Sequence, residues 1–173
     1  VGVLLLVVGC VPYREYPRFK PPAARRLDYN LDARRHVASN GLVVMLMPDR
    51  SESLVQVDMR YQVGANADPV GKGGLAHLVE HMMFLLRPGG AGAPPLDQTL
   101  AQRSLYFNAY TTATTTHYTT SAVPGELAGI LAIEAARLSP NCGWLSDDAV
   151  VREREVVSNE LRLRQPLVSG PYA

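Results

Sequence analysis

The chain has 173 residues, which fits one domain or part of one and is enough to bury a core without disulfide or metal scaffolding. Its 17 basic and 16 acidic residues give a formal net charge of +1. This balance gives no electrostatic reason to expect a nucleic-acid partner or a strongly acidic one.

The first ten residues form an apolar run that ends at Cys10, and Val7-Val8-Gly9-Cys10 resembles the lipobox at which bacterial lipoproteins are cleaved and acylated. The run is too short to span a bilayer but fits the apolar region of a signal peptide. A buried strand is the alternative interpretation. We therefore expect residues 1–10 to be a signal remnant. Cys10 would then be lipidated and would anchor the protein in a bacterial cell envelope, facing the periplasm.

Residues 11–31 are rich in proline and polar residues, which predicts an extended tether. We expect the folded part to cover residues 32–173. Asn40-Gly41 before an apolar segment predicts a β-hairpin. Strict alternation of apolar and polar residues over 54–63 then predicts a strand with one wet face.

The hydrophobic period changes at Leu75. Leu75, Leu78, Val79 and Met82 form the apolar stripe of a helix, which we expect to be its packed face. A loop rich in glycine and proline follows over 87–95, then a short helix over 96–102 and strands over 106–110 and 116–123. Helices are predicted over 126–138 and from Ser146, a capping residue, to about residue 164. This order predicts an α+β fold, a largely antiparallel sheet with helices packed on one face.

Residues 77–81 read His-Leu-Val-Glu-His, the inverted form of the HExxH zinc-peptidase motif. At about 100° per residue, His77 and His81 lie one helical turn apart on one face, with Glu80 between them. Both imidazoles can therefore reach one metal ion. We expect these three polar side chains to point away from the apolar stripe.

A catalytic zinc site needs three protein ligands and an open position. The last predicted helix offers Glu153, Glu155 and Glu160. An HxxEH motif followed by an E-x6-E helix resembles the family of pitrilysin, insulin-degrading enzyme and mitochondrial processing peptidase. The resemblance extends over most of the chain after about residue 32 and implies one half of a metallohydrolase domain of the mitochondrial processing peptidase type.

The family resemblance assigns further residues. It implies Zn²⁺ as the cofactor and Glu160 as its third ligand beside His77 and His81. Glu153 corresponds to the first glutamate of the pair. It lies two helical turns before Glu160, so it is placed to support the site.

Asn108-Ala109-Tyr110-Thr111 resembles the family's NAxT strand, which implies that Asn108 and Ala109 hold an extended substrate at a sheet edge. The glycines that usually precede this asparagine are absent. His117 and Tyr118 are interpreted as residues of the following strand.

The function implied is a zinc metalloendopeptidase acting on peptides or unfolded segments, with Glu80 as the general base. The family also carries a further half of this domain and a second, metal-free domain. We therefore expect a second peptidase-like domain or subunit, and weak or no cleavage by residues 1–173 alone.

Two alternatives stay open. S-ribosylhomocysteinase, a lyase, also uses an HxxEH motif and takes a cysteine as its third ligand, and Cys142 is available here. A noncatalytic peptide-binding subunit of the same fold is the other alternative, although such subunits have lost the motif that this chain keeps.

Overall fold

The structure, a computed structural model, describes residues 32–138 and 145–164. The chain divides into two compact units, residues 1–48 and 49–173, and each is described by itself. The predicted signal remnant with Cys10, the whole predicted tether, and Cys142 lie outside the described residues.

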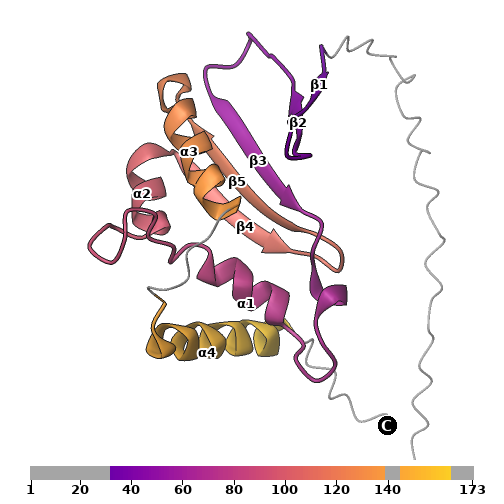
Figure 1. The fold of residues 1–173 in the computed structure, drawn as a ribbon, viewed down its shortest axis with the longest axis vertical. Coiled ribbons are helices and arrows are strands. Elements are labelled where there is room, and N and C mark those ends of the chain that lie inside the picture. Colours follow the sequence, from indigo (N-terminus) through magenta and orange to yellow (C-terminus); the bar gives the residue numbers. More distant parts are fainter. Residues whose placement is uncertain (1–31, 139–144, 165–173) are drawn as a thin grey trace, which may run out of the picture. The chain divides into compact units, whose positions relative to one another are not determined.

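The first unit contributes the predicted β-hairpin (Figure 1). β1 (Arg34–Val37) pairs with β2 (Val43–Leu46) in antiparallel register. Gly41 lies in the left-handed region with φ +86°, which only glycine adopts without strain. The Asn40 side chain accepts a hydrogen bond of 3.1 Å from the Leu42 amide. Asn40 and Gly41 therefore make the turn that the sequence predicts.

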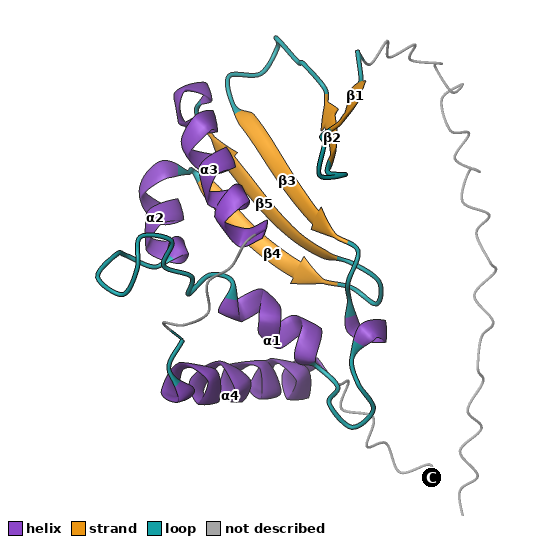
Figure 2. Ribbon diagram, viewed as in Figure 1, coloured by secondary structure: helices purple, strands orange, loops and turns teal. Residues whose placement is uncertain are grey.

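The second unit is built on a three-stranded antiparallel sheet (Figure 2). Its strands are β3 (Val55–Tyr61), β4 (Tyr106–Thr111) and β5 (Thr116–Ala122). The spatial order is β3-β5-β4, so β5 is central and β4 lies at one edge. Along β3 apolar residues are half-buried and polar residues exposed, as the alternating sequence predicts.

Helices accompany this sheet, and their bounds are α1 (Leu75–Met82), α2 (Leu96–Arg103), α3 (Leu127–Leu138) and α4 (Asp147–Arg164). Two short 3₁₀ turns are η1 (Ala65–Ala67) and η2 (Pro124–Glu126). Ser146 caps α4 by accepting a hydrogen bond of 3.2 Å from the Ala149 amide. The predicted α+β fold with a largely antiparallel sheet is confirmed. Within the described residues, no helix is both long and apolar enough to cross a membrane.

One continuous core joins α2 and α3 to the sheet. Its buried members are Leu86, Leu96, Leu100, Ala122, Ile130 and Ile133, with Val55, Val57, Met83, Phe84 and Phe107 packed around them. Because these side chains come from both helices and all three strands, α2 and α3 cover the same face of the sheet. The loop after α1 also enters this core through Met83 and Phe84, which fixes the end of that helix.

The core also encloses an ion pair. Glu134 and Arg137 of α3 are each 1% exposed, and Arg137 Nε lies 3.4 Å from Glu134 Oε2. The guanidinium carbon lies 4.2 Å from the ring centroid of Tyr118 and 4.8 Å from that of Phe84. Burial raises the pKa of the Glu134 carboxyl, and the charge of Arg137 opposes that rise. The aromatic rings and Glu134 together compensate a cation that would otherwise be costly to bury.

Replacing Arg137 by methionine should leave the Glu134 carboxyl buried without its counter-charge. We expect the free energy of unfolding of the full-length protein to fall by about 3–5 kcal/mol at pH 7. The raised pKa means that the neutral carboxyl is favoured in the folded state, so the deficit should shrink as the pH falls toward 4.

Urea unfolding at several pH values measures both effects. Arg103→Met is the matched control, because Arg103 pairs with Glu126 on the surface at 48% and 35% side-chain exposure. That variant should lose at most about 1 kcal/mol. Equal losses in the two variants, or a deficit at position 137 that does not depend on pH, would contradict the interpretation.

Candidate metal centre

α1 presents the residues of the HxxEH motif together. The ring centroids of His77 and His81 lie 4.9 Å apart. His77 is 9% exposed and Glu80 is 5% exposed, so two of the three polar side chains are buried rather than solvated. One helical turn thus places two imidazoles side by side, as the spacing predicts.

α4 brings a carboxylate to this pair from far along the chain. Glu160 Oε2 lies 3.5 Å from His77 Nε2, and Glu160 Oε1 lies 3.8 Å from His81 Nε2. One donor atom from each of the three side chains falls within 4.8 Å of the others. Ligand atoms of one tetrahedral zinc ion, each about 2.0–2.2 Å from the metal, lie about 3.3–3.6 Å apart. The donor set of two imidazoles and a carboxylate fits Zn²⁺, and the two histidine–carboxylate distances of 3.5 and 3.8 Å are close to that spacing.

Glu153 lies behind His81. Its Oε2 is 3.1 Å from His81 Nδ1. A carboxylate accepts hydrogen bonds, so Nδ1 is the donor in this contact, and a neutral imidazole then carries its lone pair on Nε2, on the side of Glu160. Glu153 is therefore placed to select the tautomer and the ring orientation that a metal ligand needs, and its supporting role stays a prediction.

The site opens toward the edge strand. A hollow of about 250 Å³ is lined by His77, Glu80, His81, Phe84, Asn108, Ala109 and Glu160. The predicted substrate-binding residues therefore border the same space as the predicted metal ligands. That they bind substrate, and that the three ligands bind zinc, stay predictions.

The backbone of β4 is available at this edge. Thr112 donates from its amide to the Thr115 carbonyl, and bonded pairs alternate along an antiparallel ladder. The amide of Ala109 therefore points to the outer edge of the sheet. There it donates a hydrogen bond of 2.9 Å to the side-chain oxygen of Asn108.

The prediction that the apolar stripe of α1 is its packed face is wrong. Leu75 is 38% exposed and Val79 is 44% exposed, whereas Ala76, His77 and Glu80 are the buried residues. The helix packs against β4 and α4 through the face that carries the site. The candidate site is built from side chains of α1, β4 and α4. The face of α1 that carries His77 and Glu80 therefore lies against the other two elements and is buried.

Two residues that sequence reasoning missed fix the start of α1. Asp68 accepts hydrogen bonds from the Gly74 amide (2.7 Å, Oδ2) and the Ala76 amide (2.8 Å, Oδ1). Gly74 has φ +92°, and a Cβ there would approach Leu161 of α4 within 3.2 Å. An acidic residue ahead of a helix is a familiar capping signal, but this one acts from six and eight residues away, beyond any local sequence rule.

The third missed residue is Thr111, whose hydroxyl lies 2.5 Å from Glu80 Oε2. Its place in the Asn108-Ala109-Tyr110-Thr111 motif was the signal that could have found it.

His117 is confirmed as a strand residue. It is 5% exposed and is satisfied by Asp58 Oδ1 at 3.2 Å and Thr115 Oγ1 at 3.1 Å.

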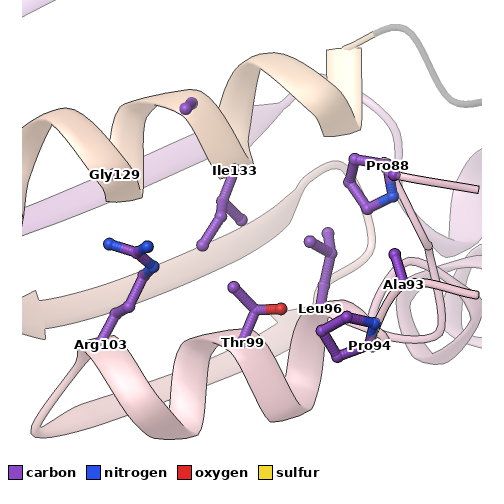
Figure 3. A pocket seen from close by; sticks show the side chains of 10 residues that line it. Pro88, Ala93, Pro94, Leu96, Thr99, Arg103, Gly129 and Ile133 are labelled. Carbon is purple, nitrogen blue, oxygen red and sulfur yellow. The ribbon is translucent and has the colours of Figure 1, made fainter.

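A second hollow, of about 300 Å³, lies between α2, α3 and the loop before α2 (Figure 3). Its lining is mostly apolar, with Thr99 and Arg103 as the polar side chains. Arg103 is already paired with Glu126 at 2.8 Å. None of the residues that line this hollow is a histidine, cysteine, aspartate or glutamate, whereas the candidate metal ligands line the smaller hollow at α1.

Known proteins are similar to this chain in sequence and in fold. A family model described as Insulinase (Peptidase family M16) matches residues 43–165. The zinc protease PqqE of Helicobacter pylori is 31% identical over 127 residues, which is 72% of this chain and 28% of that protein. Insulin-degrading enzyme of Bos taurus is 26% identical over 113 residues, 61% of this chain and 11% of that protein.

Solved structures agree. The crystal structure of a protease from Helicobacter pylori matches with a TM-score of 0.67 and 27% identity, covering 78% of this chain and 32% of that one. Pitrilysin matches in fold with a TM-score of 0.67 at 24% identity, covering 79% and 14%. This chain therefore spans less than a third of the length of these relatives.

The contacts of Asp68 can be tested directly. Asp68→Ala removes both acceptors from the first turn of α1, which should cost about 0.5–2 kcal/mol of stability. Hydrogen exchange at the Gly74 and Ala76 amides of the full-length protein should become faster. Asp49→Ala is the control, because Asp49 caps only an exposed bend at Ser51. If the two amides stay as protected as in the wild type, Asp68 does not hold the start of the helix.

Proposed function

Because the chain belongs to the insulinase family (peptidase family M16), we propose that it carries the zinc site of a metalloendopeptidase that hydrolyses peptide bonds in peptides or unfolded segments. Family membership supports the general type, a zinc metallopeptidase. The observation that carries the proposal is the convergence of His77, His81 and Glu160 beside Glu80, in a hollow that borders an edge strand.

His77, His81 and Glu160 would hold the zinc ion, with Glu153 orienting His81. The metal would supply a Lewis acid for the scissile carbonyl and acidify a water molecule. Glu80 is the general base. Thr111 engages its Oε2, so Oε1 is the atom that takes the proton from the attacking water and returns it to the leaving amine.

The substrate would be an extended peptide that adds to the sheet along β4. The outward amide of Ala109 is a donor for a substrate carbonyl, once the Asn108 side chain releases it. Backbone pairing of this kind accepts many sequences and requires an unfolded segment, which favours peptides over folded proteins as substrates.

The relatives are longer than this chain, and we propose that a second peptidase-like domain or subunit completes the cleft. A lipid anchor at Cys10, placing the protein in a bacterial cell envelope, is likewise a proposal and rests on the lipobox-like residues alone. A noncatalytic peptide-binding subunit is the second candidate. The complete set of ligands and the placement of Glu80 favour the enzyme.

Metal analysis of two variants separates the peptidase from the lyase. Glu160→Ala in the full-length protein should abolish stoichiometric zinc at submicromolar free metal, because two imidazoles alone bind weakly. Cys142→Ser should keep one zinc per chain. Full occupancy in the first variant together with zinc loss in the second would make Cys142 the third ligand and remove the support for a peptidase.

Glu80→Gln tests the chemistry, since the substitution keeps size and helix propensity but removes the base. Zinc content should be unchanged. Cleavage of an unstructured peptide should slow by about 10²–10⁴-fold, measured on the full-length protein, which here means this chain together with the proposed second peptidase-like domain or subunit. Wild-type cleavage should stop on addition of a chelator and return with zinc. Parallel loss of zinc and activity would mean that Glu80 supports the metal, and unchanged turnover would exclude it from the mechanism.

A further inference from the structure

The hydroxyl of Thr111 is the contact through which the sheet reaches the proposed base. Thr111 ends β4, and its Oγ1 lies 2.5 Å from Glu80 Oε2. An ionised carboxylate only accepts, so the threonine is the donor. Within residues 32–138 and 145–164, this is the hydrogen bond that the structure gives to the Glu80 side chain, and that side chain is 5% exposed.

A neighbouring threonine limits what the Thr111 hydroxyl does. Thr116 Oγ1 lies 3.2 Å from Thr111 Oγ1 and donates its own hydrogen to the Val63 carbonyl at 2.9 Å. Thr116 therefore has no hydrogen left for Thr111. The single hydrogen of Thr111 goes to the shorter and charged acceptor, Glu80, because charge-assisted hydrogen bonds are the stronger ones. Thr116 of β5 and the Val63 carbonyl, which follows β3, thus fix Thr111 as the donor to Glu80.

We propose that Thr111 is a positioning residue: it holds Glu80 Oε2 so that Oε1 serves as the proton acceptor, and it ties the base to the strand on which the peptide docks. This rests on the proposed function. Ala109, two residues earlier, presents its amide at the outer edge of the same strand. A peptide paired with that edge is therefore aligned with Thr111 as well, and so with the carboxylate that Thr111 holds.

A purely structural role for Thr111 predicts a different outcome. If the hydroxyl only satisfied a buried carboxylate, its loss would lower stability without a selective effect on turnover. A positioning role predicts a loss in kcat at constant zinc content, because binding to the strand edge and to the metal uses other atoms. The two roles are therefore separable by the choice of variant and readout.

The test compares Thr111→Val with Thr111→Ser in the full-length protein. Valine keeps the shape and β-branching and removes the donor, and serine keeps the donor. We expect Thr111→Val to lower kcat by about 10–100-fold with zinc content and KM nearly unchanged, and Thr111→Ser to restore kcat to within about threefold of the wild type. Thr99→Val is the control, since it also deletes a hydroxyl donor. Thr99 lies on α2 and donates to the carbonyl of Pro95, the residue before that helix. It should behave as the wild type.

A second readout does not depend on activity or on bound zinc. Crystal structures of the zinc-free proteins should show the Glu80 carboxylate turned from its wild-type position in Thr111→Val and retained in Thr111→Ser. An unmoved carboxylate in the valine variant, wild-type kcat in that variant, or a serine variant as impaired as valine would each overturn the proposal. Failure of the proposed function is recognised separately, by undiminished cleavage in Glu80→Gln.

Discussion

The contact between α1 and α4 is the constraint on which the candidate site depends, because it is what brings Glu160 to the two histidines. α4 approaches the start of α1 through Leu161 and Val157, which lie 3.2 and 3.9 Å from the position that a Cβ of Gly74 would occupy. Val157, Glu160 and Leu161 share one face of their helix. The apolar side chains that dock α4 therefore also deliver the carboxylate, and a glycine with positive φ at the helix start makes the approach close enough.

What the sequence predicts well is local. The period of apolar residues locates the strands and helices, the Asn40-Gly41 pair locates the hairpin, and a one-turn spacing joins His77 to His81. What it does not predict is which face of α1 is buried, because that depends on β4 and α4 rather than on the helix itself. Asp68 and Thr111 were missed for the same reason, since their partners lie eight and thirty-one residues away. Glu160 was found only because the resemblance to a known family supplied the long-range pairing.

The candidate site and the hydrophobic core share a residue, Phe84. Phe84 lines the hollow at α1, and its ring centroid also lies 5.7 Å from that of Tyr118 and 5.9 Å from that of Phe107. The same ring lies under the guanidinium of Arg137. An ion pair buried in the core thus supports one wall of the hollow through an aromatic contact. A hydrophobic replacement of the pair could match its packing volume but would not supply the cation–π contact with Phe84.

Under the proposed function, the edge strand β4 must be protected when empty and available to a peptide. An exposed edge with free amides is a site for unwanted pairing with other chains. Here the Asn108 side chain occupies the outward amide of Ala109, so this donor is satisfied without a partner strand. The contact is between adjacent residues and is exposed, so releasing it requires only a side-chain rotation and no change in the backbone. A peptide carbonyl can therefore replace the asparagine oxygen in a one-for-one exchange of hydrogen bonds, while Thr111, on the same strand, stays fixed against Glu80.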